Sequence, residues 1–131
     1  MSVRNVILVE DDPDDRDLFT TFFGRRPDVK LLPAVTNGIE LIQYLESLLS
    51  DIDFPHLIVL DQNMPMMNGK QTLQYLKSNP RYSNIPAVIY STYADSSLIV
   101  DCKKLGAKMV ASKPIDDHGY QKMMDDFLQI L

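Results

Sequence analysis

The chain has 131 residues, a usual length for one compact domain, and 45% of them are hydrophobic and 24% charged, as in a folded globular protein. The formal net charge is −5, and an acidic surface repels nucleic-acid phosphate, so we expect no direct binding to DNA or RNA. No apolar run reaches the ~20 residues that cross a bilayer, and the first residues lack the pattern of a signal peptide. The single cysteine, Cys102, cannot form an internal disulfide, and we expect a reducing, cytoplasmic location.

Three short apolar runs predict strands that are buried on both faces of a parallel sheet. They are Val6–Val9, Leu57–Leu60 and Ala87–Tyr90. Val29–Val35 predicts a weaker strand, which we place at an edge of the sheet because Pro33 lacks the backbone N–H that an inner strand needs. Met109–Ser112 is the fifth predicted strand.

Apolar residues between these strands recur at the three- and four-residue spacing of helices. The first helix is predicted to begin after Asp12, its N-cap, with Pro13 at the first helical position. The third is predicted to begin near Gly69 and to end before Pro80. The alternation of strand and helix predicts an α/β fold with a parallel sheet and helices on both faces. Because no linker is visible and the chain stops on the fifth predicted helix, we expect one domain over residues 1–131 and no output domain.

Polar residues follow the predicted strands at the points where the strands end. Glu10 and Asp11 follow the first strand, Asp61 the third, Ser91 the fourth and Lys113 the fifth. In an open parallel sheet the carboxyl ends of the strands lie along one edge, and ligands bind there. We therefore expect these side chains to converge.

Carboxylates that gather at one point repel each other, so they need a counter-charge, either Lys113 or a divalent cation. Mg²⁺ prefers oxygen ligands, and Asp11, Asp61, a backbone carbonyl near Asn63 and a phosphoryl oxygen would form such a set. An aspartate carboxylate is also a nucleophile that can accept a phosphoryl group. Ser91 and Lys113 would then donate to the phosphoryl oxygens.

Four segments carry a resemblance to a known family. Leu8–Asp12 reads Leu-Val-Glu-Asp-Asp, and Leu57–Gly69 reads LIVLDQNMPMMNG. Ile85–Ile89 then leads to Ser91, and a Lys-Pro pair follows the fifth strand. In this order and at these spacings, the chain resembles the response-regulator receiver family over its full length.

The resemblance implies a flavodoxin-like, doubly wound sheet of five parallel strands in the order 2-1-3-4-5. It assigns the phosphoacceptor to Asp61, the switch hydroxyl to Ser91 and the family's lysine to Lys113. It also implies that acidic side chains and one backbone carbonyl bind Mg²⁺. These metal-binding residues are Glu10, Asp11, Asp61 and, through its carbonyl, Asn63.

The chain departs from the family pattern at two positions. Ser91 stands where the family often has threonine, which keeps a hydroxyl. Val110 stands where the family usually has an aromatic residue that moves inward upon activation, so the resemblance carries over the phosphorylation chemistry but not this aromatic coupling. The peptide bond before Pro114 is usually cis in the family.

Some residues near this edge have simpler interpretations. Asp12, Asp14 and Asp15 are expected to be helix-start residues that face water, favoured by the helix dipole, rather than ligands. Tyr93 is expected to be partly exposed packing, and the alternative hypothesis is that it screens the phosphoryl group from water. Thr92 is the alternative to Ser91 as the switch hydroxyl.

The expected function is that of a stand-alone response regulator of a two-component phosphorelay. A sensor histidine kinase or phosphotransfer protein would phosphorylate Asp61, and the readout would be binding to an unidentified downstream protein. We expect no membrane partner, and a monomer or a weak phosphorylation-dependent dimer. We expect no enzyme activity apart from self-catalysed phosphoryl acceptance and loss.

Three other functions remain as alternatives. A Mg²⁺-dependent phosphatase that forms an aspartyl phosphate needs an acid two residues after the nucleophile, where this chain has Asn63. A nucleotide- or flavin-binding module needs a Gly-rich phosphate loop, which is absent from the sequence. A phosphate-free pseudo-receiver would lack part of the acidic, acceptor and lysine set, which is complete here.

Overall fold

The computed structural model describes residues 2–131, and within them five strands alternate with five helices. The strands are β1 (Arg4–Val9), β2 (Val29–Leu31), β3 (Leu57–Asp61), β4 (Ala87–Ser91) and β5 (Met109–Ser112). The helices are α1 (Pro13–Gly24), α2 (Gly38–Ser47), α3 (Gly69–Ser78), α4 (Ser96–Lys104) and α5 (Asp117–Gln129), with one short 3-10 turn, η1 (Asp51–Asp53), after α2.

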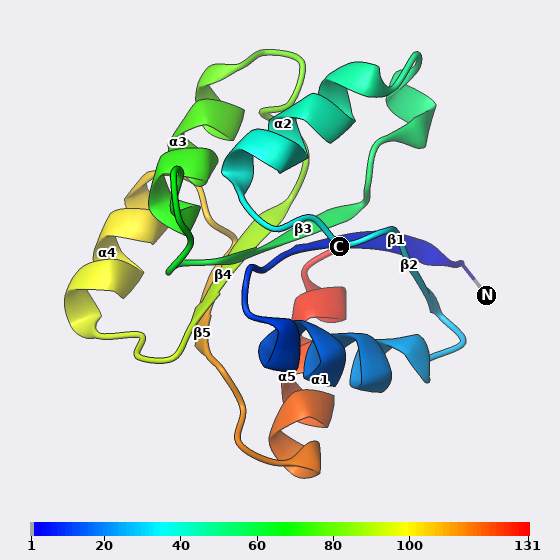
Figure 1. Ribbon diagram of the computed structural model, residues 1–131, viewed down its shortest axis with the longest axis vertical. Coiled ribbons are helices and arrows are strands. Elements are labelled where there is room, and N and C mark those ends of the chain that lie inside the picture. The colour runs from blue at the N-terminus through cyan, green and yellow to red at the C-terminus, as the bar shows by residue number, and fades with distance from the viewer. Residues whose placement is uncertain (1) are drawn as a thin grey trace.

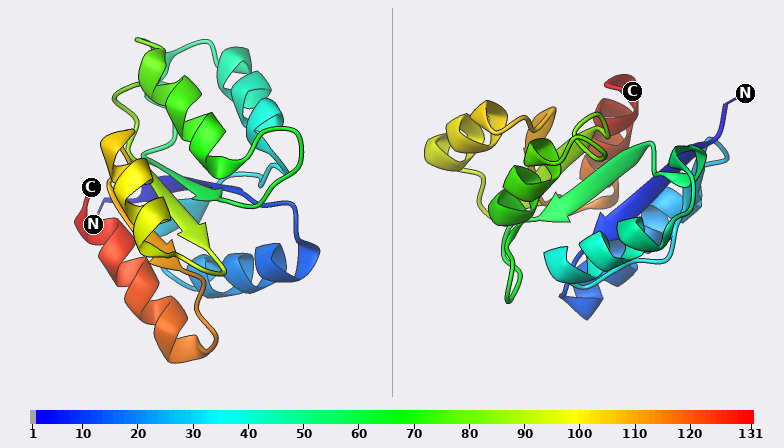
Figure 2. Two further views of the ribbon diagram at one scale, coloured as in Figure 1. Left: turned by 90° about the vertical axis from the view of Figure 1, so that its left-hand side faces the viewer. Right: turned by 90° about the horizontal axis from the view of Figure 1, so that it is seen from above.

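The strands form one parallel sheet in the order β2-β1-β3-β4-β5 (Figure 1). Helices α1 and α5 cover one face of the sheet, while α2, α3 and α4 cover the other (Figure 2). Each face has its own hydrophobic core. The predicted doubly wound, flavodoxin-like fold with strand order 2-1-3-4-5 is therefore confirmed.

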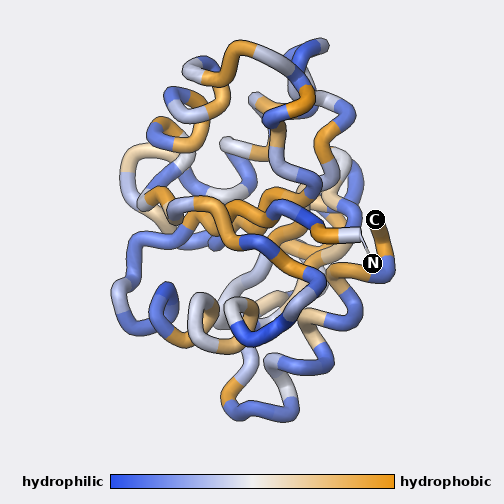
Figure 3. Tube along the Cα trace, turned by 90° about the vertical axis from the view of Figure 1, so that its right-hand side faces the viewer, coloured by the Kyte–Doolittle hydropathy of each residue, from blue (hydrophilic) through white to orange (hydrophobic). Residues whose placement is uncertain are grey.

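The central strands are apolar because both of their faces are covered by helices. Every residue of β3 and β4 is buried, and so are the last four residues of β1. The strands in the middle of the molecule are accordingly mostly hydrophobic, whereas the outer turns of the helices are hydrophilic (Figure 3). The edge strands β2 and β5 are only partly buried.

The strand predicted over Val29–Val35 is shorter than expected. Strand β2 lies at the edge of the sheet, as predicted, but it ends at Leu31, two residues before Pro33. Val35 returns to pair with Val9 in an isolated bridge. The proline is responsible because it has no N–H to continue the ladder.

The turns at the carboxyl edge are fixed by helix caps. Asp12 accepts the backbone N–H of Asp14 at 2.8 Å, and Pro13 is the first residue of α1, as predicted. Asn68 and Gln71 form a reciprocal capping box at the start of α3, which also begins at the predicted residue, Gly69. These caps fix where the loops after β1 and β3 end. Between residues 2 and 131 no helix is long and apolar enough to cross a membrane.

Candidate functional site

The carboxyl ends of the central strands lie level with one another. In the sheet register Val9 pairs with Leu60, Asp61 with Tyr90, and Ser91 with Ser112. The residues that the sequence placed after these strands therefore meet at one edge, as predicted. Glu10, Asp61 and Ser91 are all buried there.

Three carboxylates form a cluster at this edge. One oxygen from each of Glu10, Asp11 and Asp61 lies within 4.8 Å of the others. Within the described chain, Glu10 Oε2 and Asp61 Oδ1 are buried and have no hydrogen-bond partner. Buried carboxylate oxygens without partners are costly unless a cation or proton joins them, so this donor set fits a divalent cation that prefers oxygen ligands. Asn63 is two residues beyond Asp61, in the loop that leads to α3.

The shared burial and repulsion affect the protonation of Glu10. Burial, followed by the close approach of the Asp61 carboxyl group, raises the pKa of Glu10 to about 9, although Lys113 acts in the opposite direction. A carboxyl group with this pKa is protonated at neutral pH. A metal ion that binds Glu10 must therefore displace this proton.

Lys113 lies at the centre of the acidic residues. Its Nζ donates hydrogen bonds to Glu10 Oε1 at 2.9 Å and to Asp15 Oδ2 at 2.8 Å. It also lies 3.1 Å from Asp61 Oδ1, as an ion pair. Burial by itself would lower the pKa of Lys113, but the hydrogen bonds to Asp15 and Glu10 and the charge of Asp61 outweigh it and raise the pKa above its ordinary value. The side chain of Lys113 is therefore protonated and positively charged at neutral pH.

Ser91 is the hydroxyl at the end of β4. Its side chain is buried, whereas Thr92 is exposed, which favours Ser91 over Thr92 for the switch position. Ser91 Oγ donates to the backbone oxygen of Tyr93 at 3.4 Å, a long hydrogen bond. Tyr93 is 77% exposed, so it packs less against the rest of the domain than the partly exposed packing expected from the sequence.

Asp15 was predicted to face water, and for this residue the prediction is wrong. It lies in the first turn of α1, and its carboxylate bonds directly to Lys113. Asp12, by contrast, is the helix cap, and Asp14 is exposed, as expected. The cap at Asp12 predicted where α1 begins, but the packing of α1 against the sheet decides which acidic residue of its first turn reaches Lys113.

The peptide bond between Lys113 and Pro114 also differs from the family pattern, because no peptide bond is cis in residues 2–131. The trans form is the lower-energy isomer of an X–Pro bond by about 0.5–1 kcal/mol. Val110 is half-buried on the side of the sheet that α2, α3 and α4 cover.

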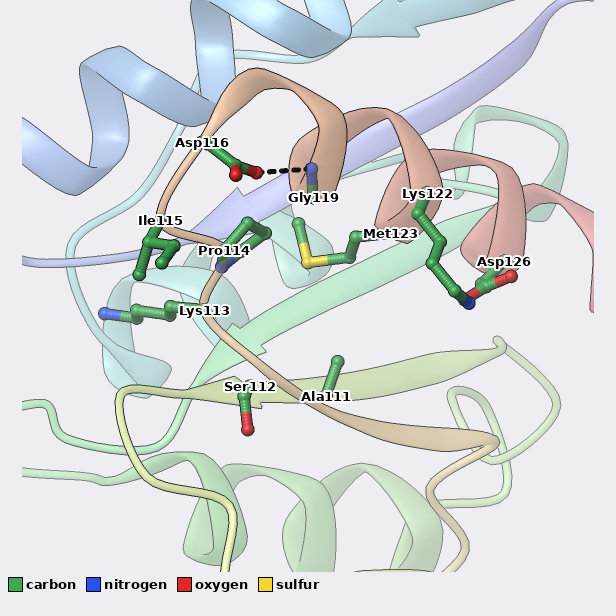
Figure 4. Close-up of a pocket in the computed structure, with 10 residues that line it drawn as sticks. All are labelled: Ala111, Ser112, Lys113, Pro114, Ile115, Asp116, Gly119, Lys122, Met123 and Asp126. Atoms are coloured by element: carbon green, nitrogen blue, oxygen red, sulfur yellow. Dashed lines mark hydrogen bonds and ion pairs between the residues drawn. The ribbon is translucent and has the colours of Figure 1, made fainter.

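A hollow of about 350 Å³ lies between β5 and α5, on another side of Lys113. It is lined by residues that include Ala111, Lys122 and Met123. Figure 4 shows the side chain of Lys113 pointing away from Lys122 and Met123. The ammonium therefore belongs to the acidic cluster and not to this hollow.

The sheet order, the acidic cluster and the hydroxyl and lysine beside it together define a receiver-type α/β domain. A family model described as "Response regulator receiver domain" matches residues 6–125. The chain belongs to this family. Membership is consistent with a role in two-component signalling.

Individual relatives agree with this assignment. The chain is 31% identical over 112 residues to a protein-glutamate methylesterase/protein-glutamine glutaminase of Bacillus licheniformis, covering 83% of this chain and 29% of that protein. It is 32% identical over 102 residues to the nitrate/nitrite response regulator protein NarL of Escherichia coli, covering 78% of this chain and 44% of that protein. The chain spans about a third of the length of the methylesterase relatives that it matches, between 28% and 36%.

Solved structures share the fold. The phosphorylated cyanobacterial phytochrome response regulator RcpA superposes with a TM-score of 0.83 at 24% identity, covering 99% of this chain and 97% of that one. The Mn²⁺-bound form of response regulator Rcp1 gives a TM-score of 0.78 at 24% identity, with 94% and 90% covered.

Proposed function

We propose that this domain accepts a phosphoryl group on Asp61 from a phosphohistidine of a sensor histidine kinase or of a phosphotransfer protein. The observation that carries the proposal is the environment of Asp61. Its carboxylate is buried, one of its oxygens has no hydrogen-bond partner in residues 2–131, and an ammonium group lies 3.1 Å away. A buried carboxylate whose one unbonded oxygen, Oδ1, faces only this ammonium is suited to bind a group from outside.

In the proposed reaction a carboxylate oxygen of Asp61 attacks the phosphorus in line. The new bond joins that oxygen to phosphorus, and the phosphorus–nitrogen bond of the donor breaks, which returns the histidine. Lys113 and Ser91 donate to the oxygens of the phosphoryl group. We propose no other enzyme activity for this domain beyond accepting and slowly losing this group.

We propose that the divalent cation is Mg²⁺. The acidic cluster would hold it through Glu10, Asp11 and Asp61, together with the backbone carbonyl of Asn63. When bound, Mg²⁺ would neutralise charge that builds up on the phosphoryl oxygens. The structure of the Mn²⁺-bound form of Rcp1 supports the choice of a divalent cation.

The proposed output is a change in protein binding. Phosphoryl oxygens would draw Ser91 and Lys113 toward Asp61, and these residues end β4 and follow β5. We propose that this movement biases the segments from β4 to α5 between two arrangements that a downstream protein distinguishes. A monomer or a weak phosphorylation-dependent dimer, in the cytoplasm, is compatible with this role.

The acceptor is tested by incubation with acetyl phosphate and Mg²⁺, followed by intact mass measurement. The wild-type protein should gain one phosphoryl group, and Asp61→Asn should gain none. Asp53→Asn is the matched control, because Asp53 is an exposed aspartate in η1, before the opposite end of β3. Equal labelling of Asp61→Asn would refute the acceptor, and continuous turnover of small phosphate esters would favour a phosphatase instead.

A further inference from the structure

Tyr90 is a buried aromatic residue beside the acceptor that the proposed reaction does not use. It is the register partner of Asp61 in the neighbouring strand, and Ala111 is its partner on the other side. Partners in a parallel sheet project to the same face, and Lys113 follows Ala111 by two residues, which keeps the same phase. Asp61, Tyr90 and Lys113 therefore share the face that α1 and α5 cover.

The ammonium of Lys113 lies over the ring of Tyr90. The distance from Nζ to the ring centroid is 4.9 Å, within the range of a cation–π interaction. Tyr90 is fully buried, so water does not weaken this attraction. The ammonium of Lys113 therefore has an aromatic ring on one side, in addition to the acidic side chains that it contacts.

The ring itself is held in place by other aromatic side chains. Phe19 meets it edge-on, with centroids 5.8 Å apart and an interplanar angle of 60°. Phe19 in turn stacks on Phe23 at 4.1 Å. A ring fixed in this way provides a rigid surface, whereas the side chain of lysine has four rotatable bonds of its own.

The hydroxyl of Tyr90 makes no hydrogen bond with any described residue, although it is buried. The contacts of this side chain with its surroundings are therefore those of its ring. The roles of the ring and of the hydroxyl can be tested separately, because Tyr90→Phe keeps the ring and removes the hydroxyl.

We infer that Tyr90 is a positioning residue for Lys113. Three carboxyl groups contact the ammonium, namely those of Glu10, Asp15 and Asp61. The ring face fixes the place of the ammonium without occupying any of its N–H donors. Lys113 can then exchange a carboxylate oxygen for a phosphoryl oxygen while it stays over the ring. This inference rests on the proposed acceptance of a phosphoryl group by Asp61.

The first test compares labelling by acetyl phosphate and Mg²⁺ across a double-mutant cycle. Tyr90→Leu should lower the maximal labelling rate about tenfold and change the half-saturating acetyl phosphate concentration little. In a Lys113→Ala background the same substitution should have almost no further effect. Tyr90→Phe should restore most of the lost rate. An equal loss in both backgrounds, or no rescue by phenylalanine, would overturn the inference.

Phe127→Leu is the matched control for a loosened core. Phe127 is fully buried in the same hydrophobic cluster, and its aromatic contact is with Phe23 rather than with Tyr90. The Phe127→Leu protein should be phosphorylated by acetyl phosphate at nearly the wild-type rate, at a temperature where all variants remain folded. A loss as large as that of Tyr90→Leu would show that general packing is responsible and would refute a specific role for Tyr90.

A second measurement does not depend on phosphorylation. Protons above an aromatic ring face are shielded, so the ε-methylene resonances of Lys113 should lie upfield of ordinary lysines in the unmodified protein, and equally so in Tyr90→Phe. Ordinary positions in the wild type would reject the contact even if Tyr90→Leu failed to fold. An upfield shift in a protein that acetyl phosphate does not label would count against the proposed function and not against the contact.

Discussion

The ammonium of Lys113 lies closer to Asp15 than to Asp61, at 2.8 Å and 3.1 Å respectively. The contact of the ammonium with Asp61 is therefore not its shortest. Asp15 belongs to α1, and its side chain is less buried than that of Asp61. Asp15, at the rim of the site, thus shares the lysine with the proposed acceptor, Asp61.

This sharing predicts the effect of Asp15→Asn. Removing the charge of Asp15 frees a donor of Lys113 and reduces the repulsion of an anionic phosphoryl donor, and both effects act in the same direction. We expect labelling by acetyl phosphate to become about threefold faster. Asp14→Asn changes the charge equally at an exposed neighbour and should have a smaller effect. Slower labelling of Asp15→Asn would contradict competition for Lys113.

The protonation of Glu10 predicts a pH dependence of metal binding. Its pKa is raised to about 9, so below this pH a proton must leave before its carboxylate can bind a cation. The apparent affinity for Mg²⁺ should therefore increase with pH, by up to about tenfold per pH unit, and level off near pH 9. Calorimetric titration between pH 6 and 10 in buffers of different ionisation enthalpy would measure the affinity and the released proton. Glu10→Gln should bind more weakly and lose most of this dependence.

The exposure of Tyr93 predicts a role in the lifetime of the phosphoryl group. Its ring is free of the core, and its backbone oxygen accepts the hydrogen bond of Ser91, so this segment lies next to the proposed phosphoryl site. If the ring folds over the site, Tyr93→Ala should lose phosphate about threefold faster, since water reaches the aspartyl phosphate more easily. Tyr93→Phe should behave like the wild type. An unchanged rate of loss in Tyr93→Ala would remove the screening hypothesis.

The close approach of Gly69 to the backbone of Asp61 predicts that a larger residue cannot fit at this position. A Cβ at this position would lie 2.5 Å from the backbone oxygen of Asp61 and 3.0 Å from Gln62 Cα, and backbone atoms cannot move aside easily. Gly69→Ala should therefore destabilise the domain by about 1–3 kcal/mol and also slow labelling, because the strain falls on the loop that follows Asp61.

Gly24→Ala is the control for this substitution. A Cβ at Gly24, the last residue of α1, would meet nothing within 4 Å. Its stability should be unchanged or higher by up to about 1 kcal/mol. Urea unfolding of both variants would compare them, and equal stabilities would disprove the clash at Gly69.

The order and type of most elements followed from the sequence because their signals are local. An apolar run without polar positions, such as Leu57–Leu60, is buried on both faces, and its short length and β-branched residues favour a covered parallel strand. The convergence of Glu10, Asp61, Ser91 and Lys113 followed as well, since all carboxyl ends of a parallel sheet share one edge.

The partners of Lys113 were decided by the tertiary structure. Asp15 and Lys113 are 98 positions apart, and Tyr90 reads in the sequence as one more apolar residue of a strand. Whether an acidic residue in the first turn of α1 faces water or the sheet depends on how that helix packs, and whether a ring lies under an ammonium depends on the register of β4 against β5. Such contacts are set by packing between distant elements, for which local periodicity carries no information.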